Sequence, residues 1–466
     1  MRRHPKLILL AVIAVLLTGL WFLLDYHAKH RLNSLVAALR AAGEPLSIRD
    51  VERLRRSYPD DQNMALSLIE PGRAINDYEQ SESFKSRAAS TPIFGNGATP
   101  AIGERWPDES LELCRRVLDD NRSILQAVHR AARLPGGRYP VEWREPSVNT
   151  LFPHMVRHPM LMKLLRCEAM VAAHDGRRDE AYRALQDVLA LNDVLSDELM
   201  LFAGLRALAC HALCLNAILE TVSLTPLTDA QLADLQSRIA SAEDRPSLRL
   251  AYLGERAVMF ESLSWAYAMD DIAEIDFYCV ARSSAWRLLP GSMYLDQEAL
   301  LRIESKLCDA ARLPLQQAVA QATKIEQESL PVPSYCRCAQ MLLPSMAKAF
   351  TIWSRKLATS RAAQAALAAE RFRLVNGRWP TSLGQLQPEY LSEIPQDPFS
   401  EGPLKFAADD RGVRIWSIGS DGVDDGGKVR QLESVRRTKD DGDEGAFLPS
   451  VDRRNRPARP RPSLSG

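Results

Sequence analysis

The chain has 466 residues, a length that suits about three domains of average size or one large domain with a smaller one. Hydrophobic residues make up 46% and charged residues 25%, the composition of a globular protein with a sizeable core. Because 59 basic residues balance 59 acidic ones, a strongly basic nucleic-acid-binding protein is excluded and no nucleic-acid partner is expected. The eight cysteines are too dilute for a small disulfide-rich scaffold.

An apolar segment at residues 7–26 opens the chain. It contains no proline, and its first charged residue is Asp25. Its length approaches the roughly 20 residues with which a helix crosses a bilayer. Arg2, Arg3 and Lys6 precede it, as expected for the cytoplasmic side of a membrane span.

A cleaved signal peptide is the competing interpretation of this segment. Signal peptides have a shorter apolar region and end in a small-x-small cleavage site, whereas residues 25–30 read Asp-Tyr-His-Ala-Lys-His. We therefore predict a cytoplasmic stub at residues 1–6 and an uncleaved transmembrane signal anchor at residues 7–26. The protein should be a single-pass protein of the inner (cytoplasmic) membrane, with the bulk of the chain outside the cytoplasm.

Residues 27–344 are predicted to form an extracytoplasmic helical domain, because Leu, Ala and Arg recur there at three- and four-residue spacing. Residues 175–178 (Asp-Gly-Arg-Arg) separate two amphipathic runs and look like the turn of a tetratricopeptide-type helical hairpin, in which Ala181 permits close packing. No regular repeat follows, which favours an irregular helical bundle over a repeat array. Thr228 is the expected N-cap of a further helix, with a capping box.

The composition changes after a long helical pattern that begins near residue 345. Residues 404–406 and 413–416 alternate like strands, and a tight turn lies between them. We predict that residues 345–449 form a long helix plus a small α+β module with an antiparallel sheet. Residues 450–466 contain few apolar side chains and are expected to be a disordered tail. The fold class is therefore mainly α.

Three parts of this module carry a family resemblance. Residues 368–380 (Ala-Ala-Glu-Arg-Phe-Arg-Leu-Val-Asn-Gly-Arg-Trp-Pro), 397–399 (Asp-Pro-Phe) and 416–422 (Trp-Ser-Ile-Gly-Ser-Asp-Gly) resemble the C-terminal domain of type II secretion major pseudopilins in order and spacing. The resemblance implies a small antiparallel sheet and a calcium-binding loop after a long helix. Pseudopilins begin with a processed Gly-Phe-Thr-Leu-x-Glu segment, whereas residues 1–6 are Met-Arg-Arg-His-Pro-Lys. A filament subunit is therefore not expected.

A second resemblance covers the middle of the chain. Residues 42–46 (Ala-Gly-Glu-Pro-Leu), 137–140 (Gly-Arg-Tyr-Pro) and 254–257 (Gly-Glu-Arg-Ala) are similar to segments of uncharacterised bacterial membrane-anchored helical proteins with the same C-terminal module. It implies an architecture and no activity.

Asp421, Asp424 and Asp425 are crowded into a glycine-rich stretch at residues 421–427. Crowded carboxylates repel one another unless water or a cation screens them. Calcium prefers oxygen ligands in such loops, and the pseudopilin resemblance places its calcium loop here. Two interpretations stay open, a calcium site with Asp421 and Asp424 as the first side-chain ligands, and a solvated acidic turn. No other cofactor is expected.

The chain contains no Walker A loop and no GxGxxG, HExxH or GxSxG motif. His154 and His158 are four residues apart and, with Glu142, are the nearest candidates for a hydrolase cleft. Pro153 and Pro159 argue against a regular helix there, which favours a solvated or hydrogen-bonded pair over a catalytic one.

Other reactive residues have plain structural interpretations. Cys-His-Ala-Leu-Cys at residues 210–214 lies among leucines and is expected to be packed core rather than a metal site. The acidic run at residues 270–276 is expected to be a solvated face. In an oxidising compartment we expect at least one long-range disulfide, which should involve Cys336 or Cys338.

Two classes of function follow. The favoured one is a non-enzymatic envelope protein, anchored through residues 7–26, with a protein-interaction or scaffolding role alongside other envelope proteins, linked to secretion or surface assembly. The alternative is an envelope hydrolase with a cleft in the helical domain.

Overall fold

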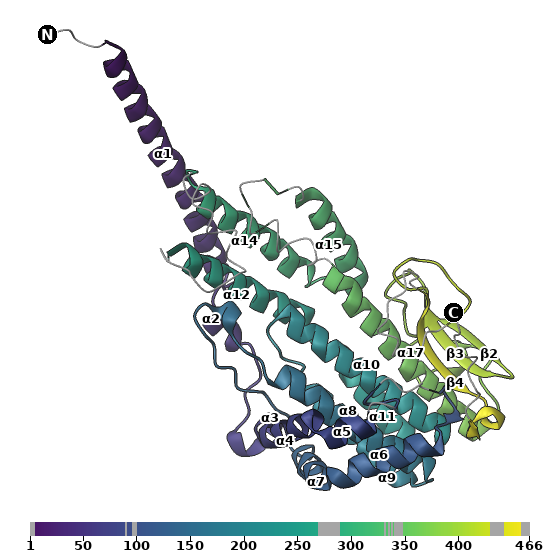
Figure 1. The fold of residues 1–466 in the computed structure, drawn as a ribbon. Coiled ribbons are helices and arrows are strands. Elements are labelled where there is room, and N and C mark those ends of the chain that lie inside the picture. The colour runs from purple at the N-terminus through teal and green to yellow at the C-terminus, as the bar shows by residue number, and fades with distance from the viewer. Residues whose placement is uncertain are drawn as a thin grey trace, which may run out of the picture.

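The computed structural model of the chain describes residues 5–88, 91–95, 100–268, 289–329, 332–333, 336, 339, 348–428 and 442–457. It is mainly helical, as predicted (Figure 1). The α-helices are α1 (Pro5–Ala41), α2 (Ile48–Glu52), α3 (Met64–Ser67), α4 (Ile69–Gln80), α5 (Glu82–Ala88), α6 (Asp108–Asp120), α7 (Arg122–Ala131), α8 (His154–His174), α9 (Arg178–Val194), α10 (Leu201–Leu224), α11 (Asp229–Ser241), α12 (Leu248–Ala268), α14 (Ser292–Ala310), α15 (Leu315–Ser329) and α17 (Lys348–Asn376).

The strands and short 3-10 helices lie in loops and in the C-terminal part. The strands are β1 (Glu104–Arg105), β2 (Lys405–Asp409), β3 (Gly412–Ser417), β4 (Glu444–Pro449) and β5 (Arg456–Pro457). The 3-10 helices are η1 (Asp60–Gln62), η2 (Ser147–Asn149), η5 (Leu383–Leu386) and η6 (Val451–Arg453).

The N-terminal half of α1 projects away from the other helices (Figure 1). Its apolar side chains are exposed along this half, from Ile8 to Leu24. Two of the described helices, α1 and α10, are long and apolar enough to cross a membrane, but α10 is mostly buried inside the protein. Of the helices in the described ranges, only α1 therefore combines length and apolar character with an unburied surface, which is compatible with a membrane anchor.

The C-terminal half of α1 packs against α14. Ala28 is buried in this contact, and the Asp25 carboxylate accepts a hydrogen bond from the Gly291 amide at 3.0 Å, just before α14 begins. Further along both helices, Arg31 Nη2 lies 3.1 Å from Glu298 Oε1. The two helices therefore run in the same direction away from the apolar half of α1.

Glu44, just after α1, contacts α12 and the segment that follows α14. Its carboxylate accepts hydrogen bonds from Arg249 at 3.2 Å and from Arg256 at 2.9 Å, and it also pairs with Arg312. Arg256 is almost fully buried. Burial raises the pKa of Glu44, but the hydrogen bond from Arg256 and the three positive charges outweigh it and lower the pKa. The segments at residues 42–46 and 254–257 are thus partners in one ion-pair cluster.

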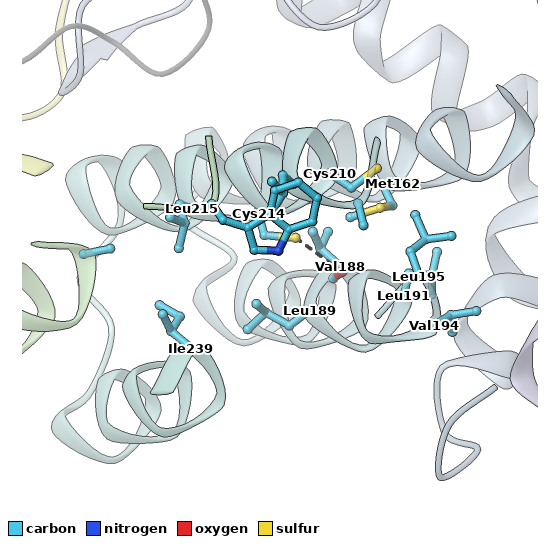
Figure 2. Packing of buried hydrophobic residues seen from close by; sticks show 14 of the residues in the cluster. Met162, Val188, Leu189, Leu191, Val194, Leu195, Cys210, Cys214, Leu215 and Ile239 are labelled. Atoms are coloured by element: carbon cyan, nitrogen blue, oxygen red, sulfur yellow. Dashed lines mark hydrogen bonds between the residues drawn. The ribbon is translucent and has the colours of Figure 1, made fainter. Parts of the chain in front are cut away.

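The predicted helical hairpin is formed by α8 and α9. Gly176 adopts a positive φ of 71° in the turn, and Ala181 is fully buried between the helices. Thr228 caps α11 with the expected capping box. Cys210 and Cys214 on α10 lie over α9 among leucine and valine side chains (Figure 2), where the Cys214 thiol donates to the Val188 carbonyl at 3.6 Å. This part of the structure is packed core, as predicted.

The C-terminal module contains the predicted antiparallel sheet, with strand order β2-β3-β4. The β2–β3 hairpin pairs Lys405 with Trp416 and closes at Asp409 and Gly412. Strand β4, which no sequence pattern indicated, pairs along all of β3. The sheet lies beside α17 at the far end of the molecule from the projecting half of α1 (Figure 1), and its buried residues belong to the same core as the helices. The helical domain and the module therefore share one core.

The start of the tail expected to be disordered at residues 450–466 is ordered. Residues 451–453 form η6, and β5 pairs in parallel with β1. Arg454 lies against Glu370 on α17, with Nη1 2.7 Å from Oε1, and Asn455 donates to the Leu224 carbonyl at 2.6 Å. The prediction was wrong for these residues because it considered only their lack of apolar side chains. They are held instead by hydrogen bonds and an ion pair to buried groups of the helices. Residues 458–466 lie outside the described residues.

The described cysteines are buried free thiols. The expected long-range disulfide, through Cys336 or Cys338, does not form at Cys336, whose thiol donates to the Leu295 carbonyl at 3.6 Å. Cys338 and the acidic run at residues 270–276 lie outside the described residues.

Candidate functional site

A pocket of about 400 Å³ lies between α4, the segment at residues 139–144 and the beginning of α8. Its walls are partly apolar and include Leu68, Ile69 and Leu151. Glu142 and His154, two of the three residues predicted for a hydrolase cleft, line this pocket. A pocket that is mostly apolar with a few converging polar groups is the usual form of a ligand site.

The histidine pair lies on a regular helix, contrary to the prediction. Pro153 is the N-cap residue of α8 and Pro159 lies within the helix. A proline at the start of a helix costs little because the first amides have no intrahelical partner. His154 and His158 are 7% and 0% exposed, so of the two roles left open, solvated or hydrogen-bonded, the structure shows the hydrogen-bonded one.

His158 is a structural residue. Its Nε2 lies 3.0 Å from the Leu191 carbonyl, and its Nδ1 lies 2.9 Å from the Tyr139 hydroxyl. Because a carbonyl only accepts, we assign the proton to Nε2, so that Nδ1 accepts from the hydroxyl. Burial lowers the pKa of His158 to about 4 and raises the pKa of Tyr139. Both ring nitrogens are thus occupied, and His158 is neutral.

His154 is held differently. Its ring stacks on Tyr139 with centroids 4.4 Å apart, and its Nε2 lies 3.2 Å from Glu198 Oε1. Since a carboxylate only accepts, Nε2 carries a proton and donates it to this contact, which leaves Nδ1 outside it. Among the described residues Nδ1 has no hydrogen-bond partner, and His154 is a lining residue of the pocket. A histidine oriented by a carboxylate is the arrangement of a general base.

Arginine side chains give the pocket its charge. Arg73, Arg144 and Arg157 line it together with one carboxylate, Glu142. Arg73 is paired with Glu70 at 2.5 Å. The guanidinium groups of Arg144 and Arg157 have no ion pair or hydrogen bond within the part of the chain that the structure describes.

Buried ion pairs hold residues next to the pocket, and no sequence pattern indicated them. Arg55 contacts Glu198 at 3.4 Å and Glu52 at 3.1 Å. Glu52 also accepts from the Trp143 indole at 3.1 Å and pairs with Arg138. The segment Gly-Arg-Tyr-Pro at residues 137–140 is therefore held through both its arginine and its tyrosine.

A second strongly perturbed histidine lies outside the pocket. His129 Nδ1 is 2.6 Å from Asp187, and Nε2 is 3.1 Å from Glu168. The hydrogen bond to Asp187, followed by that to Glu168, raises the pKa of His129 to about 9. Since both nitrogens are bound to carboxylates of α8 and α9, this histidine ties helices together and has no position free for chemistry.

The predicted calcium residues lie in the loop after β3. Asp421 Oδ1 accepts from the Val423 amide at 2.9 Å, and Asp424 Oδ1 accepts from the Trp416 indole at 2.9 Å. Asp443, which the sequence analysis missed, accepts from the Asp425 amide at 3.3 Å. Burial and the nearby charges of Asp424 and Asp425 raise the pKa of Asp443. Asp424, Asp425 and Asp443 are thus close enough to repel one another, whereas Asp421 does not belong to this group.

Within the described residues, no group of three His, Cys, Asp or Glu side chains has metal-ligand geometry. Calcium at Asp421, Asp424 and Asp425 therefore stays a prediction. The crowded acids around Asp443 fit a cation in one respect, because a positive charge would relieve their mutual repulsion.

If the loop binds calcium, about 1 mM Ca²⁺ should raise the melting temperature of the full chain, because a ligand that binds only the folded state stabilises it. The double variant Asp421→Ala with Asp424→Ala should lose this shift. Asp424 also accepts from Trp416, so the single variant Asp421→Ala is measured beside it, and Mg²⁺ serves as the ion control. An equal melting temperature with calcium and with chelator would leave the solvated turn as the interpretation.

Comparison with protein families, with curated proteins and with solved structures found no match for this chain. The class that the fold itself defines is a predominantly helical protein with an N-terminal apolar helix and a small C-terminal antiparallel sheet.

Proposed function

We propose that this chain is a single-pass, membrane-anchored envelope protein whose helical domain lies outside the cytoplasm and interacts with other envelope proteins, in a secretion or surface-assembly role that the pseudopilin-like module suggests. The observation that carries the proposal is α1, whose exposed apolar half continues without a break into a half that packs on α14. An anchor joined in this way holds the domain close to the bilayer instead of on a flexible tether.

The position of the α14 N-terminus follows from this arrangement. Asp25, at the end of the apolar run, contacts Gly291. Leu289, two residues earlier, is 49% exposed and should lie at the membrane surface. Leu313, 40% exposed, follows the other end of α14, at about 30 Å because a helix rises 1.5 Å per residue. It is the matched control for distance from the bilayer.

Fluorophore labelling of the full chain in liposomes tests the anchor. Val15→Cys, Leu289→Cys and Leu313→Cys are each labelled in a background with Cys279→Ser and Cys338→Ser, since the other native cysteines are buried. Quenching by spin-labelled lipid should be strong at residue 15, intermediate at residue 289 and absent at residue 313. An unquenched label at residue 15 contradicts the membrane anchor. Equal quenching at residues 289 and 313 contradicts the proposal that the start of α14 lies at the membrane surface.

The hydrolase is the second candidate function, favoured by the Glu198-oriented His154 in the pocket. If the protein is a scaffold without hydrolase activity, the wild type should hydrolyse a panel of soluble esters and phosphoesters no faster than the His154→Gln variant does. His158→Gln is the control for structural damage, since His158 has no free nitrogen. Turnover that is lost in His154→Gln and kept in His158→Gln would replace the scaffold by the hydrolase.

A further inference from the structure

The pocket beside α8 has a charge pattern that the proposed scaffolding role does not use. Three guanidinium groups and one carboxylate line it, and Arg73 alone among these arginines has a carboxylate partner in the described structure. Arg144 and Arg157 therefore leave an excess of positive charge in the lining of a partly apolar cavity, because Glu142 balances only one of them. Arginine forks match carboxylate and phosphate oxygens in geometry as well as in charge.

Arg157 is held in place at the pocket wall. A Cβ atom on Gly72 of α4 would lie 3.4 Å from Arg157 Cβ and 3.9 Å from its Cδ, so the aliphatic part of the side chain crosses the helix at this glycine. Its own backbone belongs to the first turn of α8, a helix of 21 residues. The amides at a helix N-terminus add partial positive charge to the same region.

A residue that lines this cavity also has a polar atom without a protein partner in the described structure. His154 is 7% exposed, is fixed through Nε2 by Glu198, and leaves Nδ1 without a hydrogen-bond partner among the described residues. A ring nitrogen without a protein partner can bind water or a ligand. The aromatic face of Tyr139 lies next to it, where the two rings stack.

We propose that this pocket binds a small ligand that carries an oxyanion, a carboxylate or a phosphate monoester, on a compact apolar body. Arg144 and Arg157 bind the oxyanion, the walls formed by Leu68, Ile69 and Leu151 contact the apolar body, and His154 Nδ1 forms a hydrogen bond with a polar group of the ligand. The proposal requires neither the membrane anchor nor hydrolysis.

Ligand-observed fluorine NMR on the full chain in nanodiscs tests it with three soluble probes. The probes are 4-fluorobenzoate, 4-fluorophenyl phosphate and 4-fluorobenzamide, of which the amide has the shape of the benzoate without its charge. At least one of the two anions should bind more tightly than the amide, and the tighter anion identifies the class of oxyanion. The proposal would be overturned if the amide bound as tightly as both anions did, or if no probe bound.

Two arginine variants locate the bound anion. Arg157→Gln and Arg144→Gln should each weaken binding of the anion about tenfold, the usual effect of losing one charge-assisted hydrogen bond. Arg133→Gln, on an exposed arginine outside the pocket, should bind as the wild type does. If Arg157→Gln fails to fold, Arg144→Gln still tests the site, because Arg144 is exposed and its substitution should not affect folding. Unchanged anion affinity in Arg144→Gln means that the anion binds elsewhere.

Discussion

Gly254→Ala is expected to lower the free energy of unfolding by about 3 kcal/mol or more, because the added methyl group has no space and overpacked cores cost this much when the backbone must move. Gly254 lies on α12, where a Cβ atom would overlap the carbonyl group of Leu199. The adjacent Glu255 accepts a hydrogen bond from the Leu201 amide at 3.2 Å. Close approach at Gly254 thus lets α12 cap the N-terminus of α10, whose own N-cap residue has no side-chain cap.

Urea unfolding of the full chain in detergent measures this effect. Gly384→Ala is the matched control, since only the Ser382 hydroxyl lies within 4 Å of a Cβ atom at that glycine, at 3.6 Å. The control should stay within about 0.5 kcal/mol of the wild type. If Gly254→Ala is as stable as Gly384→Ala, the helices can separate at no cost and the argument from close approach is wrong.

Glu370→Gln is expected to cost about 3–5 kcal/mol, because it removes the negative member of a buried ion-pair cluster. Glu370 is buried on α17 and accepts from Arg373 Nη2 and Arg454 Nη1, both at 2.7 Å. The glutamine variant leaves the guanidinium of Arg454 buried without a carboxylate. The residues that follow Arg454 should then leave the surface of α10.

The pH dependence of this cluster has a defined sign. Burial raises the pKa of Glu370, but the hydrogen bonds from Arg373 and Arg454 outweigh it, so the pKa lies below the ordinary value of 4.5. A carboxyl group with a lowered pKa binds fewer protons in the folded state than in the unfolded state. Its stabilisation is therefore fully present above the unfolded pKa and is lost as the pH falls through the folded one. Glu370→Gln should remove this part of the acid sensitivity.

Two measurements separate local from global effects of Glu370→Gln. Urea unfolding reports the whole chain, and the rate of trypsin cleavage after Arg454 reports release of the tail. The exposed Glu393→Gln serves as the control, and both of its values should match those of the wild type. Slow cleavage after Arg454 in Glu370→Gln would show that the tail is held by other contacts.

The sequence predicted best where the signal is local. The turn at residues 175–178, the capping box at Thr228 and the β2–β3 hairpin each depend on a few adjacent residues, and each is present in the structure. Strand β4 was missed because it lies far along the chain from β3 and its pairing depends on that partner. The two prolines led to the wrong prediction for the backbone of the histidine pair. The free energy gained by burying the rest of α8 exceeds the cost of the backbone hydrogen bond that Pro159 cannot donate.

The sequence by itself determined the apolar N-terminal helix, the mainly helical class and the small C-terminal sheet, since these follow from composition, periodicity and turn residues. Tertiary structure alone decided that Glu198 orients His154, that Glu370 holds Arg454, and that Glu44 joins the end of α1 to α12. The partners in these contacts are 44, 84 and 212 residues apart. A local sequence pattern cannot predict these contacts, because the partner of a buried charge has to be close in space and can lie anywhere along the chain.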